Sequence, residues 1–315
     1  MANFDNLSHY SVLLNESIDA LQIKENGIYV DCTLGGGGHS SKILEKIPSG
    51  WLYAFDQDEM AIDVAKKRLE LIGNNFTIIN KNFETLVDSL KEQGVKEVDG
   101  IIYDLGVSSF QFDLPERGFS YRFDARLDMR MDLRQELDAY QVVNNYSEEK
   151  LASIFYKYGE DKNARLIARK IVQERKNKPI ETTFELVDII KSALPAKILR
   201  QNSHPAKQIF QALRIEVNGE LSVLEKSLND ALELLKVGGR VVVITFHSLE
   251  DRIVKNIFKE HTTINLPKGL PFIPDGYEVK YNLVNRHVIL PSDEELSVNN
   301  RSHSAKMRII EKIKD

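Results

Sequence analysis

The sequence predicts an α/β fold in which a parallel sheet is interrupted by an inserted helical segment. Short apolar runs alternate with helix-compatible segments over the first hundred residues. This pattern stops after Asp104, and the strand signal returns at Arg240–Phe246. Strands that alternate with helices form parallel sheets covered on both faces. We therefore expect a discontinuous sheet domain of residues 1–114 and 216–315, with a helical domain at 115–215.

The first half of the sheet domain follows from apolar runs rich in aromatic and β-branched residues. Strands are expected at Ile28–Cys32, Trp51–Phe55, Phe76–Ile79 and Gly100–Tyr103. Helices are expected between them at about His39–Ile47, Met60–Leu71 and Phe83–Gln93. The order is that of repeated β-α-β units.

The second half of the chain begins with helical periodicity between Ser147 and Leu194, where Ile167, Ala168, Ile171 and Val172 share a face. The remaining expected elements are a helix at about Leu221–Leu235 closed by Gly238 and Gly239, a strand at Arg240–Phe246, a loop at Leu266–Gly276 and a strand at Lys306–Ile313. The strand at Arg240 resumes the sheet after the insertion.

Composition and length exclude several classes of protein. The 315 residues are 42% hydrophobic, but the longest mainly apolar run, Val241–Phe246, is short and includes Thr245, and a membrane-spanning helix needs about 20 apolar residues. The first ten residues lack the layout of a secretion signal, so we expect a cytoplasmic protein without membrane contact. Cys32 is the only cysteine, which excludes an internal disulfide and a cysteine-based metal cluster. We expect no metal.

Four successive glycines, Gly35–Gly38, lie between the first strand and the first helix of the sheet. In open parallel sheets, ligands bind beyond the carboxyl ends of the strands, where a glycine-rich turn lets the backbone approach them. Asp56 ends the next strand about 20 residues later, where an acid can accept hydrogen bonds from both ribose hydroxyls. The pair predicts an adenosine-containing cofactor. A simpler interpretation is that the glycines only form a turn and Asp56 caps a helix.

The dinucleotide-binding pattern G-x-G-x-x-G is incomplete. A match from Gly35 meets Ser40 at the third glycine position, and a match from Gly36 meets Ser41. A cofactor without a pyrophosphate, such as S-adenosylmethionine, does not need the third glycine. A nicotinamide-dependent oxidoreductase remains the main alternative at this point.

Two more strand ends reach the same edge of the predicted sheet. Phe83 follows the third strand and could pack against an adenine, although ordinary core packing explains it equally well. Asp104 ends the fourth strand and would face a cationic sulfonium or a substrate amine, with a turn cap as the simpler alternative.

The charge distribution points to a nucleic-acid partner despite a net charge of -5. Between Lys162 and Arg214 there are twelve Lys or Arg residues and four acids, which leaves an excess of thirteen negative charges elsewhere. A basic insertion on an acidic body is typical of a phosphate-binding lobe. For any single cation, simple solvation of a helix face is the alternative.

Two further stretches carry charged or polar patterns. Arg and Asp alternate at every second position in Arg122–Arg134, which predicts an extended, self-paired ladder that braces a loop. In Phe246–Arg252, Ser248 and Asp251 resemble a variant capping box at the start of a helix. His247 would emerge at the ligand edge of the sheet, where it is a candidate for contact with a flipped base.

Seven motifs together resemble the bacterial ribosomal RNA small-subunit methyltransferase H family, also called MraW. They are GGGGHS at Gly35–Ser40, DLGVSS at Asp104–Ser109, ERGFS at Glu116–Ser120, LDMRMD at Leu127–Asp132, YGE at Tyr158–Glu160, HPAKQIFQALRI at His204–Ile215 and FHSLEDRIVK at Phe246–Lys255. They occur in family order across nearly the whole chain. The chain departs from the family pattern at Phe110, where proline is usual, and at His303, where arginine is common.

The resemblance implies a class I S-adenosylmethionine-dependent methyltransferase with a Rossmann-like sheet and an inserted all-helical domain. It implies N4-methylation of one cytidine in the decoding region of 16S ribosomal RNA, with either the naked RNA or the small ribosomal subunit as the partner. The family's cofactor contacts fall on Gly37, Gly38, His39, Asp56, Phe83, Asp104 and Gln111. The oligomeric state stays open.

Candidate residues for the reaction and for RNA follow from these arguments taken together. Asp104 and His247 are the candidate catalytic residues. The candidate RNA contacts are Arg165, Arg169, Lys170, Lys207, Arg214 and Arg301. A ribosome-assembly factor that binds RNA without catalysis is the alternative from another functional class.

Overall fold

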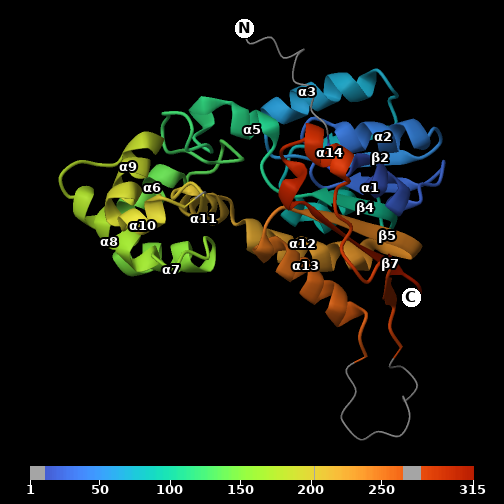
Figure 1. Ribbon diagram of the computed structural model, residues 1–315. Coiled ribbons are helices and arrows are strands. Elements are labelled where there is room, and N and C mark those ends of the chain that lie inside the picture. Colours follow the sequence, from blue (N-terminus) through green and yellow to red (C-terminus); the bar gives the residue numbers. More distant parts are fainter. Residues whose placement is uncertain (1–10, 202, 265–277) are drawn as a thin grey trace, which may run out of the picture. The chain divides into compact units, whose positions relative to one another are not determined.

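The computed structural model describes residues 11–201, 203–264 and 278–315 of the chain. The described chain divides into two compact units (Figure 1). The sheet unit contains the residues up to Gly106 and from Leu221 onward, and the helical unit contains Val107–Glu220. The chain thus changes unit at Gly106 and Glu220, where the sequence suggested 114 and 215. The expected loop at Leu266–Gly276 lies outside the described residues.

The sheet unit is built on seven strands in the order β3-β2-β1-β4-β5-β7-β6. The strands are β1 (Ile28–Asp31), β2 (Trp51–Phe55), β3 (Phe76–Ile79), β4 (Val98–Asp104), β5 (Leu235–Thr245), β6 (Tyr281–Leu283) and β7 (Lys306–Lys312). Strands β1 to β5 pair in parallel, as predicted, and β7 is antiparallel to β5 and β6. The chain runs outward from β1 to β3 and then returns to place β4 beside β1. Ligands of open α/β sheets bind at such a reversal of strand order.

Helices cover both faces of this sheet because alternate strand residues point to opposite sides. Ile101 and Val241 belong to one buried cluster, and Ile102 and Val242 belong to another. The first cluster includes residues of α4 (Leu86–Glu92), α12 (Glu220–Leu234) and α13 (Ser248–His261). The second includes residues of α1 (Leu14–Leu21), α2 (Gly38–Lys46) and α3 (Glu59–Glu70). A short α14 (Asp293–Val298) precedes β7. This three-layer arrangement is a Rossmann-like α/β fold.

Gly238 and Gly239 do not close α12, so that expectation was wrong. Helix α12 ends at Leu234, and β5 begins at the next residue. The pairing with β4 jumps from Val98–Leu235 to Gly100–Arg240, so the intervening residues form a bulge. Gly238 has a φ of 82°, a left-handed conformation that glycine adopts without strain. A glycine at a helix end and one in a bulge look alike in a sequence, because both supply positive φ.

The helical unit has a hydrophobic core of its own (green to yellow in Figure 1). Its helices are α5 (Ser109–Asp113), α6 (Ala139–Asn145), α7 (Glu148–Lys157), α8 (Ala164–Glu174), α9 (Thr183–Ala193), α10 (Ala196–Leu199) and α11 (Lys207–Asn218). On α8, Ile167, Ala168 and Ile171 are fully buried in this core, as their spacing predicted. Within the described residues, no helix is both long and apolar enough to span a membrane.

Candidate functional site

Acidic residues lie at the carboxyl ends of three neighbouring strands of the sheet unit. Asp31 is the last residue of β1, Asp104 is the last residue of β4, and Asp56 directly follows β2. Since β2, β1 and β4 are adjacent, these carboxyl groups line one edge of the sheet. Asp56 and Asp104 were predicted as site residues and Asp31 was not, although Asp31 also lies at a strand end, directly before the glycine turn.

Asp31 fixes the turn between β1 and α2. Its side chain is 1% exposed, Oδ2 accepts a hydrogen bond from Ser40 Oγ at 2.7 Å, and Oδ1 accepts one from Thr33 N at 3.0 Å. Thr33 Oγ1 in turn accepts a hydrogen bond from Asp104 N at 2.6 Å. Burial raises the pKa of Asp31, and the hydrogen bonds from Ser40 and Thr33 oppose that rise. The ends of β1 and β4 are thus tied to each other.

The glycine turn meets two separate demands. Gly35 and Gly37 have φ values of 48° and 76°, in the left-handed region that favours glycine. A Cβ on Gly37 would lie 3.2 Å from Ala65 Cβ, and a Cβ on Gly38 would collide with Ser11 Oγ. A Cβ on Gly35 would meet only Thr33 O, at 3.8 Å. Packing within the protein therefore explains Gly37 and Gly38, whereas the backbone at Gly35 is open to a ligand.

Asp56 is held beside this turn by backbone amides. Its Oδ2 accepts a hydrogen bond from Gly35 N at 2.8 Å, and its Oδ1 accepts one from Asp58 N at 2.9 Å. Burial raises the pKa of Asp56 to about 6, with the charges of Asp58 and Asp31 adding to the rise and the two amides opposing it. The N-cap of α3 is Asp58, which accepts from Met60 N. Helix capping therefore does not explain Asp56.

Phe83 begins a 3₁₀ turn, Phe83–Thr85, after β3. Its ring packs edge-to-face on Tyr103, with 5.5 Å between ring centroids and 89° between planes. The ring is only partly buried against the core cluster. Core packing thus accounts for one part of the ring, and the predicted adenine contact concerns the exposed part.

Asp104 is the least satisfied carboxyl group of this edge. Its side chain is 24% exposed, and Oδ2 lies 3.6 Å from His39 Nδ1. Its Oδ1 is shielded from solvent and accepts no hydrogen bond within the described residues. Burial raises the pKa of Asp104 well above its usual range, and the negative charges of Asp31, Glu250 and Glu295 add to the rise. A carboxylate in these surroundings is stabilised by a cation.

His39 lies in the first turn of α2 and is 4% exposed. Its Nε2 lies 3.2 Å from the carbonyl oxygen of Val12. A carbonyl can only accept, so Nε2 carries the hydrogen, and the lone pair of Nδ1 faces Asp104 in the neutral ring. Burial lowers the pKa of His39 to about 4, so the ring is neutral at pH 7.

His247 does follow β5, but it has a capping role that was expected of Ser248. Helix α13 begins at Ser248, and the N-cap is His247, whose Nδ1 accepts from Glu250 N at 3.4 Å. Glu250 Oε2 accepts from the amides of Phe246 and His247 at 2.8 and 3.2 Å. The predicted Ser248–Asp251 capping box was therefore wrong by one residue. Asp251 instead pairs with Arg308 at 2.7 Å.

Gln111 belongs to the helical unit and caps a short helix there. Its N donates to Ser108 Oγ at 3.3 Å, and its Oε1 accepts from Ser108 N at 3.2 Å, which forms a capping box for α5. Its side chain is 4% exposed. The cofactor contact that the resemblance gives to Gln111 remains a prediction.

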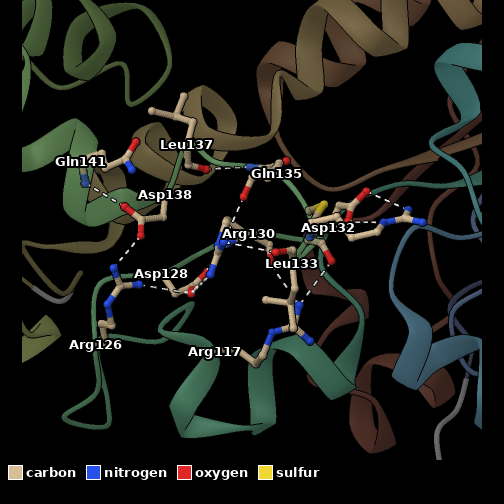
Figure 2. Close-up of polar contacts among 12 residues, drawn as sticks. Arg117, Arg126, Asp128, Arg130, Asp132, Leu133, Gln135, Leu137, Asp138 and Gln141 are labelled. Carbon is tan, nitrogen blue, oxygen red and sulfur yellow. Dashed lines mark hydrogen bonds and ion pairs between the residues drawn. The ribbon is translucent and has the colours of Figure 1, made fainter.

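The Arg–Asp stretch of the helical unit pairs with itself, but it is not extended (Figure 2). Asp128 accepts from Arg130 Nε and Nη2 at 2.9 and 2.8 Å, and Asp138 accepts from Arg126 Nη2 at 2.7 Å. Arg117 is 5% exposed and donates to the carbonyl of Arg130. The chain turns at Met129, with a φ of 60°, so the pairs close a compact loop in place of the predicted ladder.

The carbonyl groups of this loop are also bound by guanidinium groups. Arg130 Nη1 donates to the carbonyls of Leu133 and Gln135 at 3.2 and 2.9 Å. These bonds, like that from Arg117, satisfy carbonyls that have no sheet partner. We therefore interpret the stretch as a structural brace, as its sequence suggested.

The basic residues of the helical unit fall into two groups. In Lys162–Arg214, Arg169, Lys170, Lys178 and Arg214 each pair with a glutamate at 2.6–3.5 Å. Arg175 donates to the carbonyls of Val143 and Tyr146. The side chains that are exposed and make no hydrogen bond or ion pair with any described residue are Lys162, Arg165, Lys176, Lys191, Lys197, Arg200 and Lys207. We call these seven the unpaired cations.

This division separates the predicted RNA contacts. Arg165 and Lys207 are unpaired cations, whereas Arg169 and Lys170 are committed to glutamates. Arg214 is held by Glu220 through two hydrogen bonds of 2.8 Å and is only 18% exposed. Arg301 is half-buried in the sheet unit. Local sequence does not show which cations are paired, because several of the glutamates lie outside the same helix.

A comparison with protein families finds one that spans the chain. A sequence model of the MraW methylase family matches residues 6–313. Among solved structures, an rRNA methylase from Streptococcus thermophilus is similar at 13% identity and a TM-score of 0.44, covering 95% of each chain. A candidate rRNA methylase from Clostridium thermocellum is similar at 13% identity and a TM-score of 0.46, covering 97% of this chain and all of the other.

A third similar structure is a candidate methyltransferase from Streptococcus mutans in complex with SAH. It has 14% identity and a TM-score of 0.43, and it covers 96% of this chain and 99% of the other. TM-scores below 0.5 do not establish a relationship on their own. The family model, which covers nearly the whole chain, establishes it.

Proposed function

Because the chain belongs to the MraW methylase family, we propose that it methylates the exocyclic N4 of one cytidine in the decoding region of bacterial 16S ribosomal RNA. The methyl donor is S-adenosylmethionine, which supplies an electrophilic methyl group when it is bound. The resemblance in motifs supports the choice of N4 and of the small ribosomal subunit. This substrate would place the protein in the cytoplasm.

The buried, unpartnered Oδ1 of Asp104 is the observation that best supports the donor site. A cation beside this carboxylate would offset the repulsion from Asp31, Glu250 and Glu295. Asp56 would accept hydrogen bonds from the ribose, and the open backbone at Gly35 would let the adenosyl part approach. The residues present therefore fit a positively charged, adenosine-containing ligand.

A nicotinamide dinucleotide fits the same residues less well. In dinucleotide enzymes, a third glycine lets the helix pack closely on the strand. Here Ser40 occupies that position and uses its hydroxyl group to hold Asp31. Family membership and this replacement both argue against the oxidoreductase alternative.

The reaction requires alignment because the lone pair of the cytosine amino group is delocalised into the ring. Holding the two reactants in line can contribute roughly 7–11 kcal/mol. The target base must leave the RNA stack to reach a site at the sheet edge, as in other base-modifying enzymes. We assign to Asp104 the role of hydrogen-bond acceptor for the amino group, and we keep His247 as a candidate contact to the extruded base.

The unpaired cations support an RNA substrate. All seven are exposed and lie on the helical unit, where they are available to phosphates without first breaking an ion pair. If about five of them neutralise phosphates, the log–log dependence of affinity on salt has a slope of roughly -4. Such a steep dependence is expected of RNA and not of a small-molecule substrate.

The decisive test is transfer of labelled methyl groups to small subunits from a strain that lacks the gene. We expect one modified cytidine, identified by mass mapping of the nucleotide, and no transfer to subunits from the parent strain. Modification of another base or of another RNA would refute the proposed site. Tight binding of subunits without any transfer would support the assembly-factor alternative.

A further inference from the structure

His39 and Asp104 face each other at the carboxyl edge of the sheet, with 3.6 Å between His39 Nδ1 and Asp104 Oδ2. We propose that His39 is a positioning residue that holds Asp104 as a proton switch. In this switch, Asp104 is protonated in the free site, ionised beside the cationic donor, and protonated again beside the neutral product. The inference rests on the function proposed above and adds a role for His39.

The tautomer of His39 determines which of the two side chains can donate a hydrogen bond. The Val12 carbonyl fixes the hydrogen on Nε2, so Nδ1 can only accept. A hydrogen bond between the two side chains must therefore come from a protonated Asp104. The present separation is longer than a hydrogen bond, but it needs only a small side-chain movement to close, as is common for catalytic contacts in ligand-free enzymes.

The charges around Asp104 determine its protonation state in the free site. Asp31 on β1, Glu250 in the first turn of α13 and Glu295 on α14 all disfavour its ionised form. His39 on α2 is neutral and offers no compensating charge. The charged side chains that contribute most to the pKa of Asp104 are all negative. The free site therefore favours the carboxylic acid.

The two ligands differ in the property that this switch senses. S-adenosylmethionine carries a positive sulfur, whereas S-adenosylhomocysteine has a neutral thioether and otherwise the same groups. In the transfer, cytosine N4 bonds to the methyl carbon, and the carbon–sulfur bond breaks with its electron pair left on sulfur. N4 then loses one proton, which Asp104 takes and shares with His39 Nδ1. The charge that held Asp104 ionised disappears in the same step.

Calorimetry of the whole protein tests the switch through binding alone. Titrations with each ligand in buffers of different ionisation enthalpy give the number of protons released. We expect up to one more proton released with S-adenosylmethionine than with S-adenosylhomocysteine. In the pH range where free Asp104 is protonated, the ratio of the two affinities should fall about tenfold for each unit of pH lowered. Both ligands have the ribose that Asp56 is expected to bind. The pH dependence that Asp56 contributes therefore cancels in the ratio of the two affinities.

Substitutions distinguish the role of Asp104 from that of His39. Asp104→Asn should abolish the difference in proton release, and Asp88→Asn, an exposed carboxylate on α4, should leave it unchanged. His39→Leu removes the acceptor for the protonated acid, so the fall in the affinity ratio should move to lower pH. His39→Asn keeps an acceptor near the position of Nδ1, so the affinity ratio should fall in the same pH range as in the wild type.

Nitrogen NMR of the ligand-free protein gives a readout that does not depend on binding. We expect His39 with hydrogen on Nε2 and a bare Nδ1 at pH 7. Equal proton release for the two ligands, or a difference that survives Asp104→Asn, would overturn the switch. An unchanged pH dependence in His39→Leu would overturn the role of His39. If the wild-type protein shows the expected difference in proton release but transfers no methyl group to cytidine, only the proposed substrate is overturned.

Discussion

Asp56 has a raised pKa at this edge of the sheet. Its pKa of about 6 belongs to the ligand-free protein, in which burial outweighs the two amide hydrogen bonds. A ribose diol donates hydrogen bonds to a carboxylate and gains less from a carboxylic acid. Binding of the nucleoside part of a ligand should therefore depend on pH through Asp56.

We expect the affinity for adenosine, which lacks the sulfur, to be constant above pH 7 and to fall toward tenfold per unit below pH 6. Equilibrium binding of adenosine between pH 5 and 8 measures this dependence. Asp56→Asn should bind weakly at every pH and show a flat profile. A wild-type profile that stays flat down to pH 5 would exclude Asp56 as the ribose acceptor.

The ionised form of Asp104 should lower the free energy of unfolding. Its pKa is raised in the folded protein, so its favourable contribution is complete at low pH and is lost as the pH rises through that pKa. Asp104→Asn removes a charge that the fold disfavours. We expect the ligand-free variant to melt above the wild type at pH 8, with the difference shrinking at pH 5. A variant that melts below the wild type at pH 8 would contradict this assignment.

Single residues of the site could be read from the sequence where their position in a strand is sufficient. Asp56, Phe83 and Asp104 each follow an apolar run, and parallel strands bring such ends to one edge. The tautomer of His39 could not be predicted, because its partner Val12 lies 27 positions away along the chain. The N-cap of α13 was missed because histidine is not among the usual capping residues.

At the scale of elements, the loop that contains Arg117, Arg126 and Arg130 depends on one glycine. Gly118 has a φ of 68°, and a Cβ there would collide with the carbonyl oxygen of Arg126. The collision is with backbone, which cannot move aside without breaking the Arg–Asp pairs around it. The backbone of the loop and its ion pairs therefore cannot be disturbed independently of each other.

We expect Gly118→Ala to lower the free energy of unfolding by more than the roughly 1 kcal/mol that a left-handed alanine costs. Gly94→Ala is the matched control, because Gly94 has a φ of 76° and no atom within 4 Å of the added Cβ. Chemical denaturation of both variants gives the comparison. Equal losses would show that the loop yields to the added methyl group.

The unpaired cations give a second prediction about elements. Replacing Lys197, Arg200 and Lys207 by glutamine should reduce the salt slope of RNA binding by about 2 if each contacts a single-stranded phosphate. The control is the same replacement of Arg169, Lys170 and Lys178, which pair with glutamates. Both triple variants change the net charge equally. Equal effects on the salt slope would mean that total charge, and not pairing, determines RNA affinity.

The order of helices and strands could be predicted in large part from periodicity, since each element buries one face against a neighbour. The position of β7 between β5 and β6 could not, because strand order depends on pairing between distant segments. The bulge at Gly238 was missed for a related reason. It shifts the register between β4 and β5, which no local pattern shows.

For the whole molecule, two separate hydrophobic cores imply two responses to ligand. The sheet core and the core of the helical unit share no residue. S-adenosylmethionine at 100 times its dissociation constant should stabilise the unit that binds it by about 2.7 kcal/mol. We expect calorimetry to resolve two transitions, with that of the sheet unit moving upward most, because all predicted cofactor contacts except Gln111 lie in that unit. A single transition that moves as a whole would show that the units unfold together.

The pairing of β4 with β5 has a consequence for folding during synthesis. Asp104 is paired with Ile244, which leaves the ribosome 140 residues later. At about 5–20 residues per second, β4 waits roughly 7–28 s for the partner that completes the middle of its sheet. During that interval one edge of a strand that is buried in the folded protein is without its final neighbour. The nascent chain is thus most vulnerable to aggregation while the helical insertion is being made, and a chaperone that protects it would have to act in that window.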